Sequence, residues 1–503
     1  MSDNQVNKAP EEEHYEMQRG IAGWQVAFIG LGGVIGSCYF LGMGIVIHDM
    51  GPAVFIAFGV VGVIVYGLMI SYAELLVNLP RKGSFVAYTS EFLGPTISTG
   101  FGWAFWFNWV CYVPSEAIAV STVVTSLIGQ QDNVAAYVGI AIGALMAITI
   151  INLSAVNVFA KIESGLAITK CFVIIAFIII AFGIWVGLWC SDGFLGATVN
   201  FGSGNFGHDL FPNGVGVILT SMTVVLVTFQ GTEIVGLTAA EAQNPEESVP
   251  AACKSVTVRI VALYMVPILL ILLIYPYALA SDKNAVFSDI MYYYHLPILG
   301  KIFAAVVLIA AFSCSNTGFY GTVRAMYGLS IEGLAPEKLG TLNKEGNPFK
   351  AVLFTLVFMW AVLILGLLSQ VTGLMGSLYG NLLSMSGFTG TLAWIGIIAS
   401  WIVFRKRYTE RGYDKNDLRA RVSNGQMWLP PFAMVAQIFC LVMMAADVSQ
   451  LPVFFMSCGA VFIPMIVRSI LNKRGKCRDI NALNSDEKTF DELYPPKQEQ
   501  VAN

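Results

Sequence analysis

Three glycines interrupt the first long apolar segment of the chain, in the stretch GGVIGSCYF at residues 32–40. A glycine costs a helix interior about 1 kcal/mol relative to alanine, so Gly32, Gly33 and Gly36 weaken this helix. Backbone groups that leave helical geometry inside a membrane must find partners in protein, water or a ligand, because hydrocarbon offers none. Free amides at such a break can hold a carboxylate, and free carbonyls can hold an ammonium group.

A second break is predicted in the sixth apolar segment, at FQGTEIVG (229–236). Two interrupted spans that lie five helices apart are what inverted-repeat transporters use to build a binding site at the membrane midplane. The alternative is that the glycines only allow helices to pack closely, as small residues do in many membrane spans. The glycine and the acid of FQGTE, taken with GGVIG, favour a binding site, and the two kinds of free backbone group suit an amino acid.

Charged side chains inside apolar segments are the next candidates. A charge at membrane depth costs about 2.5 to 3.5 kcal/mol on insertion scales, so such residues are functional hypotheses by default. Glu116 lies in the third segment, Lys170 in the fifth and Glu233 in the sixth. Lys170 either snorkels toward the cytoplasmic face or lies inside the bundle, where it could gain and lose a proton during a cycle. Glu74 and Glu163 lie nearer the ends of their segments, which predicts a solvated or structural role.

The composition indicates that these residues belong to a polytopic membrane protein. Of the 503 residues, 56% are apolar and only 12% are charged, and the mean hydropathy is +0.69. A helix needs about 20 apolar residues to cross the hydrocarbon core. We therefore predict an all-α integral membrane fold with twelve transmembrane helices, centred near residues 35, 65, 112, 145, 176, 227, 268, 314, 360, 388, 437 and 462. We expect no cleavable signal peptide, because the first 22 residues are polar and acidic.

The distribution of lysine and arginine predicts the orientation of these helices. With both termini in the cytoplasm, the loops on that side carry most of the basic residues, including the run at 405–421, whereas the stretch 189–214 has no lysine or arginine. This is the asymmetry of the positive-inside rule. The net charge of −4 does not predict a nucleic-acid surface. The expected location is the plasma membrane, with the lipid bilayer as a partner.

Residues for other chemistries are sparse. The nine cysteines are an odd number and lie mostly in or beside apolar segments, so no disulfide framework is expected. The four histidines are scattered, and no metal cluster, nucleophile constellation or phosphate loop is evident, which disfavours an enzyme and predicts no cofactor. An ion channel is disfavoured because the sequence shows no filter repeat or charged ring.

The chain resembles the amino acid, polyamine and organocation transporter superfamily, and within it the bacterial and fungal amino acid permeases, including the lysine-type ones. The stretches that carry the resemblance extend over nearly the whole chain: GGVIGSCYFLGMG (32–44), SYAELLVNLPRKGSF (71–85), FQGTEIVGLTAAEAQNPEESVP (229–250), SNTGFYGTVRAMYGLSIEGLAPEKL (315–339) and SGFTGTLAWIGIIASWIVFRKRY (386–408).

The resemblance implies a LeuT-like fold, in which ten helices form two inverted five-helix repeats and two further helices lie outside that core. It also implies alternating access, with the site open first outward and then inward. The predicted divisions are a cytoplasmic N-terminal tail (1–22), the inverted-repeat transport core of helices 1–10 (23–404), a cytoplasmic loop (405–426), helices 11 and 12 (427–472) and a cytoplasmic C-terminal tail (473–503).

The resemblance also implies roles for the residues of the two breaks. The backbone around Gly36, Ser37 and Cys38 would receive the substrate carboxylate. Carbonyls near Val34 and Ile35 in the first break, and near Phe229 and Thr232 in the second, would face its amino group. The residues predicted to bind substrate are Val34, Ile35, Gly36, Ser37, Cys38, Glu116, Phe229, Gln230, Thr232 and Glu233.

Two positions bear on coupling and on the fit of the substrate. Lys170 matches the lysine of proton-coupled relatives, in which its ammonium stands in for a bound sodium ion, so a proton is the expected coupling partner. Cys38 departs from the glycine of a Gly-Ser/Thr-Gly triplet in many relatives, and a side chain there could narrow the cavity or turn the amide away.

The substrate and the mode of transport stay open between alternatives. FQGTE is similar to the motif of permeases for lysine and arginine, and Glu116 and Glu233 could offset a cationic side chain. Acids at these positions also occur in permeases for neutral amino acids, and a gating or structural role explains them equally well. Exchange of one amino acid for another is an alternative to proton symport. A transporter-like sensor would share the fold, although such proteins often carry a long soluble extension.

Overall fold

The computed structural model describes residues 30–81, 83–153, 156–188, 209–237, 245–281, 285–343, 346–372, 377–477 and 488–497. The N-terminal tail predicted at 1–22 lies outside these residues, as do residues 189–208 of the stretch without basic residues. Within the described ranges, every regular element is a helix. Nine of these helical segments are long and apolar enough to cross a membrane, and the shorter helices Val215–Val227 and Ile260–Ile274 are also apolar.

The α-helices are α2 (Met43–Met50), α3 (Val54–Asn78), α4 (Ser84–Leu93), α5 (Pro95–Leu127), α6 (Val134–Asn152), α7 (Val156–Trp185), α8 (Val215–Val227), α9 (Ile234–Leu237), α10 (Pro245–Ile274), α11 (Val286–Tyr293), α12 (Pro297–Ile331), α13 (Phe349–Val371), α14 (Leu378–Glu410), α15 (Leu429–Met444), α16 (Leu451–Lys473) and α17 (Phe490–Leu493). Short 3₁₀ turns lie at Gly51–Ala53, Tyr277–Leu279, Glu337–Gly340, Lys415–Asp417, Asn424–Gln426 and Val448–Gln450. A π-helical turn, η1, spans Cys38–Gly42.

The two interruptions lie where the glycines and polar residues predict them. Residues 30–34 are helical, residues 35 and 36 bend, and η1 follows before the chain continues as α2. A π-helical turn changes the direction of the backbone carbonyls and often marks a functional site. In the second case α8 ends at Val227, turns occupy residues 228–233, and α9 begins at Ile234.

The part of the chain that the structure describes has fewer long helical segments than the twelve transmembrane helices predicted, and the difference arises at the two breaks and in α10. The first two centres fall in one run, because helix and turn continue without a gap from Cys38 to Asn78. The sixth centre falls on the last residue of α8, which the break shortens, and the seventh falls in α10, in which the apolar helix found among the described residues is Ile260–Ile274.

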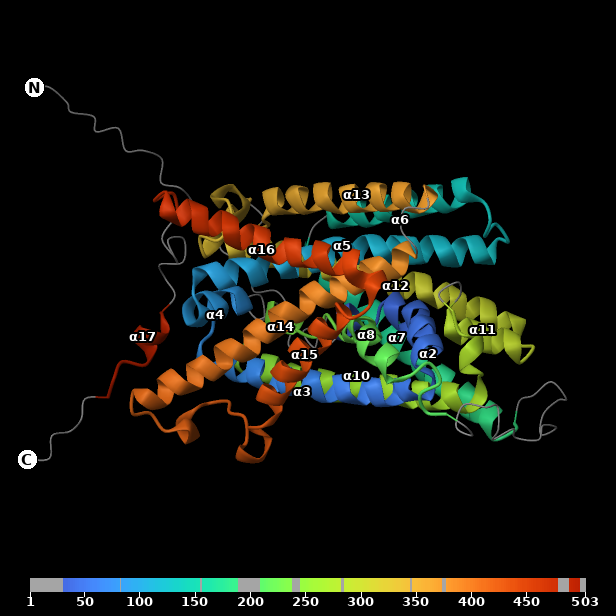
Figure 1. Ribbon diagram of the computed structural model, residues 1–503, viewed down its shortest axis with the longest axis horizontal. Helices are drawn as coiled ribbons and strands as arrows, with labels where there is room; N and C mark the ends of the chain where they lie inside the picture. Colours follow the sequence, from blue (N-terminus) through green and yellow to red (C-terminus); the bar gives the residue numbers. More distant parts are fainter. Residues whose placement is uncertain are drawn as a thin grey trace, which may run out of the picture.

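Long helices in the middle of the bundle organise the packing. α5 contacts α12, α14 and α16, and α3 contacts α10 and α15. In Figure 1 α6 and α13 lie side by side along one edge of the molecule, and α3 and α10 lie along the opposite edge. The broken helices lie between these pairs, so their free backbone groups face protein.

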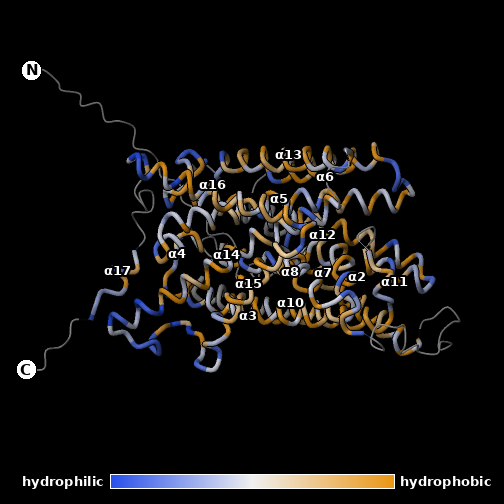
Figure 2. Tube along the Cα trace, in the orientation of Figure 1, coloured by the Kyte–Doolittle hydropathy of each residue, from blue (hydrophilic) through white to orange (hydrophobic). Residues whose placement is uncertain are grey.

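The outer helices carry apolar side chains on their exposed faces. Only 17% of the most apolar window of α6 and 22% of that of α16 is buried, compared with 78% for α14. Ile150, Val357, Leu365 and Phe455 are exposed. Figure 2 shows apolar residues along these helices and hydrophilic ones gathered at the ends of the bundle. This pattern fits a protein whose outer surface contacts lipid.

Candidate functional site

Lys170 lies inside the bundle, against the first helix break. Its side chain is fully buried. Nζ donates hydrogen bonds to the carbonyl oxygens of Gly32 at 2.6 Å and Ile35 at 2.9 Å, and to Ser313 Oγ at 2.7 Å. An ammonium group has three donors, and each has an acceptor here. The prediction that Lys170 lies inside the bundle is therefore confirmed, and the snorkelling alternative is wrong.

The amide that follows the break holds a carboxylate of the protein itself. The N–H of Ser37 lies 3.0 Å from Glu116 Oε1 and 3.1 Å from Oε2. Both residues are fully buried. The sequence predicts a substrate carboxylate at this amide, and Glu116 of α5 occupies that position in this conformation.

Hydroxyl and thiol groups close the space around these contacts. Ser37 Oγ lies 2.9 Å from the hydroxyl of Tyr379 in α14, and the hydroxyl of Tyr112 donates to Cys38 Sγ at 2.9 Å. A Cβ atom on Gly36 would lie 2.5 Å from both Glu116 Oε1 and Tyr112 Oη. The Cys38 thiol therefore contacts α5, and Gly36 is needed because side chains from other helices reach its Cα.

The two breaks contact each other directly. Gly231 has a φ angle of +105°, and a Cβ atom there would lie 2.5 Å from the carbonyl oxygen of Gly33. The hydroxyl of Tyr264 in α10 lies 3.1 Å from the Val34 carbonyl oxygen and 2.8 Å from that of Thr228. The Val34 carbonyl, predicted to face a substrate amino group, thus faces Tyr264 here.

The second break is held largely by its own acid. Glu233 Oε2 accepts hydrogen bonds from the backbone N–H of Gly231 and from Trp394 Nε1, each at 3.0 Å. Gln230 Nε2 donates to the Gly387 carbonyl of α14 at 3.2 Å. Thr232 Oγ1 donates to the Phe229 carbonyl at 3.2 Å. The predicted residues of this break therefore lie together, and most of their polar groups bond within the break or to α14.

Several residues of this arrangement carry no signal in the sequence. Tyr264, Ser313 and Tyr379 come from helices without a predicted break or intramembrane charge. Tyr112 lies one helical turn before Glu116, and this spacing could have placed it on the same face.

The two other acids that the sequence singles out, Glu74 and Glu163, differ from each other. Glu74 of α3 binds Arg405 of α14 through two contacts, Nε to Oε1 at 2.6 Å and Nη2 to Oε2 at 2.7 Å. Its predicted structural role is confirmed. Glu163 of α7 is fully buried and accepts a hydrogen bond from the Ser313 hydroxyl. A solvated position for Glu163 is wrong, because α12 covers it.

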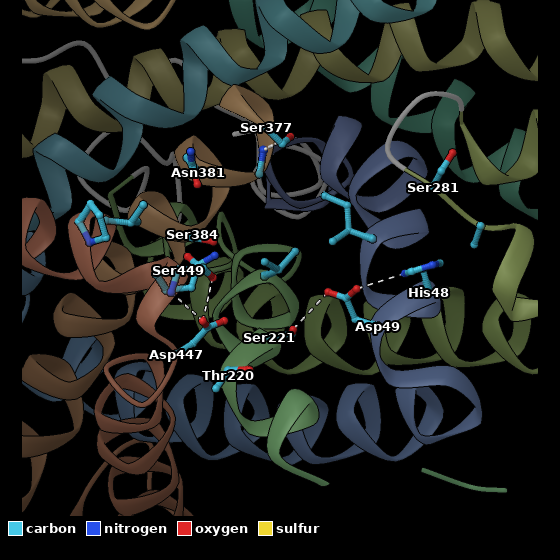
Figure 3. Close-up of a pocket in the computed structure, with 17 residues that line it drawn as sticks. His48, Asp49, Thr220, Ser221, Ser281, Ser377, Asn381, Ser384, Asp447 and Ser449 are labelled. Atoms are coloured by element: carbon cyan, nitrogen blue, oxygen red, sulfur yellow. Dashed lines mark hydrogen bonds and ion pairs between the residues drawn. The ribbon is translucent and has the colours of Figure 1, made fainter. Parts of the chain in front are cut away.

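A pocket of about 700 Å³ lies against α2, the helix that follows the first break. Residues of α2, α8, α14 and α16 line it, and Figure 3 shows His48 and Asp49 on one side and Asp447 and Ser449 on another. Tyr379, which contacts Ser37, lies in the chain between two residues of the pocket wall: Ser377, which caps the start of α14, and Gly380. Among the described lining residues, two are acidic and none is lysine or arginine.

Comparison with known proteins agrees with this geometry. The family model described as amino acid permease matches residues 25–470. The chain is 33% identical to the lysine-specific permease LysP of Lactococcus lactis over 425 residues, covering 82% of this chain and 81% of LysP. It is 33% identical to the amino-acid permease RocC of Bacillus subtilis over 411 residues, covering 81% of this chain and 84% of RocC. It is 29% identical to the gamma-aminobutyric acid permease of the same organism over 427 residues, covering 83% and 84% of the two chains. With two facing helix breaks inside a bundle of apolar helices, the chain belongs to the amino acid permease family.

Proposed function

We propose that this protein is a secondary active transporter that imports L-amino acids across the plasma membrane by alternating access. The observation that carries the proposal is the first helix break, with an ammonium group on its carbonyls and a carboxylate on its amide. These are the two charged groups that every free amino acid carries. The family membership supports an amino acid as the substrate.

The proposed architecture has twelve transmembrane helices, of which the first ten form two inverted repeats. Helices five positions apart in the proposed order pack against each other: α3 against α10, α5 against α12, and α6 against α13. Each repeat begins with a broken helix, at residues 35–36 and at residues 228–233. Such pairing supports a pseudo-twofold axis through the two breaks.

In the proposed binding step, the substrate carboxylate replaces Glu116 at the Ser37 amide. Glu116 marks the position because a carboxylate already sits there with both oxygens within hydrogen-bond distance. The amino group would then approach the carbonyls near Val34 and Phe229, which requires the Tyr264 hydroxyl to give way.

We assign the pocket to the outer side of the membrane and both termini to the cytoplasm. The pocket lies at the ends of helices that the basic-residue pattern places outside. Near the C-terminal end of α3, which this orientation places toward the cytoplasm, the buried pair of Glu74 and Arg405 ties the helix to α14. The described conformation would thus be closed inward, with Tyr379 and Ser37 between the pocket and the site.

A proton is the proposed coupling ion, and Lys170 is its carrier. Its ammonium holds the carbonyls of Gly32 and Ile35 together. Loss of a proton would remove the positive charge of Nζ, and hydrogen bonds from a neutral amine are weaker than those from an ammonium, so the hold on the two carbonyls would weaken when Lys170 becomes neutral. Proton binding is thereby linked to the shape of the substrate site.

Basic amino acids are the favoured substrates within this proposal. The pocket carries Asp49 and Asp447 without lysine or arginine among its described lining residues, and such a field raises the local concentration of cations. The similarity to LysP of Lactococcus lactis, a lysine-specific permease by name, supports the same preference for basic amino acids. Neutral amino acids remain the alternative substrates, and amino acid exchange the alternative mode.

The test is uptake of labelled L-amino acids into proteoliposomes under an inward proton gradient. We expect the wild-type protein to accumulate a basic amino acid, and Lys170→Ala to bind it without accumulating it. Lys301→Ala serves as the matched control, because Lys301 is an exposed lysine of α12. Gradient-driven accumulation by Lys170→Ala would refute the proton-carrier role.

A further inference from the structure

Glu163 is a buried acid to which the proposed function gives no task. It lies seven residues before Lys170 on α7, so the two side chains share one face of the helix. Side chains in a helix lean toward its N-terminus, which brings the Lys170 ammonium toward Glu163. The carboxylate also lies directly against Gly32, whose carbonyl holds Lys170.

One hydroxyl connects the two charged groups. Lys170 Nζ donates to Ser313 Oγ at 2.7 Å, and the Ser313 hydroxyl in turn donates to Glu163 Oε1. Both hydrogen bonds point the same way, from the ammonium through the hydroxyl to the carboxylate. We propose that Glu163 receives the proton that Lys170 releases, with Ser313 as the relay, and this inference rests on the proposed proton-coupled transport.

The other contacts of Lys170 cannot carry a proton onward. Its two remaining hydrogen bonds end on the carbonyl oxygens of Gly32 and Ile35, which have no proton to pass to a further acceptor. A hydroxyl both accepts and donates. Among the described residues, the Ser313 branch is therefore the only hydrogen-bonded route from Nζ to a carboxylate.

The proposed step balances in atoms and charge. The bond between Nζ and one hydrogen breaks as that hydrogen bonds to Ser313 Oγ, and the original hydroxyl hydrogen moves to Glu163 Oε1. Ammonium, hydroxyl and carboxylate become neutral amine, hydroxyl and carboxylic acid. The two hydrogens left on Nζ still hold Gly32 and Ile35, while its lone pair accepts from Ser313.

Other titratable groups also lie around Lys170, and each has a hydrogen-bond partner of its own. Glu116 of α5 and Cys314 of α12 interact electrostatically with it. Glu116 is already bound by the Ser37 amide, and the Cys314 thiol donates to the Gly33 carbonyl at 2.9 Å. From α10, Tyr264 binds the Val34 carbonyl. Asn316 and Thr317 of α12 face Glu163 with neutral polar groups.

The position of Glu163 also gives the transfer a direction. It lies nearer the N-terminus of α7 than Lys170 does. In the proposed orientation that end faces the cytoplasm. A proton that arrives with the substrate from outside would leave Lys170 toward the inner side.

The test compares Glu163→Gln and Ser313→Ala with the wild-type protein in three assays. These are stabilisation of the purified protein by a substrate, exchange of labelled against unlabelled substrate without a gradient, and accumulation under an inward proton gradient. We expect binding and exchange to persist in both variants and gradient-driven accumulation to be lost. Ser313→Thr, which keeps the hydroxyl, should restore accumulation.

A matched control lies two residues along the same helix. The Ser315 hydroxyl is buried and has no hydrogen-bond partner among the described residues. Ser315→Ala should therefore accumulate substrate like the wild-type protein. If Glu163→Gln folds poorly, Ser313→Ala carries the test by itself.

The outcomes separate the relay from the function on which it rests. Accumulation by Glu163→Gln or by Ser313→Ala, together with its loss in Lys170→Ala, would overturn the relay and leave proton coupling intact. A wild-type protein that binds no amino acid would overturn the proposed function and the relay with it.

Discussion

The two helix breaks of this protein are held in different ways. The charged partners of the first break come from distant helices: Lys170 from α7 and Glu116 from α5. The second break is capped by an acid two residues further along its own chain, since Glu233 accepts from the Gly231 amide. The partners of the first break can therefore leave when helices move, whereas the cap of the second moves with its break.

The glycines of the two breaks show the same contrast. The space next to Gly36 is filled by the ends of three side chains, those of Glu116, Tyr112 and Cys314. The space next to Gly231 is filled by the backbone of residues 33 and 34. Side-chain ends can shift and backbone cannot. We infer that the first break exchanges ligands and the second provides a fixed surface behind it.

The largest effect is expected from Gly231→Ala. The substitution places a Cβ atom on a residue at φ +105°, against the Gly33 carbonyl. Strain of this kind costs about 1 to 3 kcal/mol, before the clash is counted. We expect a large loss of folded protein, measured by thermal unfolding in detergent.

Gly36→Ala is the comparison for that result. The added Cβ atom meets only movable side-chain ends. The protein should therefore still fold, but it should bind substrate less well. Equal unfolding temperatures for Gly231→Ala and the wild-type protein would contradict the fixed character of the second break.

Glu116→Gln and Glu233→Gln should change different properties of the protein: the first its affinity for substrate, and the second its stability. A neutral amide weakens the competing hydrogen bond at the Ser37 amide by about 1 kcal/mol, which would raise substrate affinity about fivefold. Glu233→Gln weakens the cap on Gly231 and should lower stability with little change in affinity. Isothermal titration and thermal unfolding of both variants measure the contrast.

A loss of affinity for basic amino acids in Glu116→Gln would give this acid a different role. It would then contact the cationic side chain of the substrate. Neutral amino acids should show the fivefold rise in either case, because they offer Glu116 no charge to bind.

The smallest effect is expected from Tyr264→Phe. It removes the hydroxyl that contacts carbonyls of both breaks, at a cost of about 1 kcal/mol in stability. Tyr39→Phe is the control, because the Tyr39 ring stacks on Tyr264 at 4.2 Å and its hydroxyl donates to the Leu263 carbonyl instead. Uptake rates should change in Tyr264→Phe and stay unchanged in Tyr39→Phe.

The sequence predicts the breaks and the intramembrane charges, because glycines, acids and a lysine are conspicuous in apolar segments. It does not predict their pairing. The contact between Glu116 and Ser37 spans 79 positions of the chain, and the side-chain periodicity of one helix does not tell which neighbour it meets. For Glu163, the position near a segment end left a solvated and a structural role open, and only the structure shows that α12 covers the side chain.

The central claim is that the first break binds both charged groups of an amino acid. The direct measurement is thermal stabilisation of the purified wild-type protein by common L-amino acids, repeated with analogues of the best ligand that lack one group. For lysine these are cadaverine, without the carboxylate, and 6-aminohexanoate, without the α-amino group. A ligand at a hundredfold excess over its Kd stabilises the folded state by about 2.7 kcal/mol.

We predict that the intact amino acid gives this stabilisation and that neither analogue does, since each leaves one half of the break without its partner. Equal stabilisation by cadaverine would contradict the carboxylate site at Ser37. Equal stabilisation by 6-aminohexanoate would contradict the carbonyl site for the amino group.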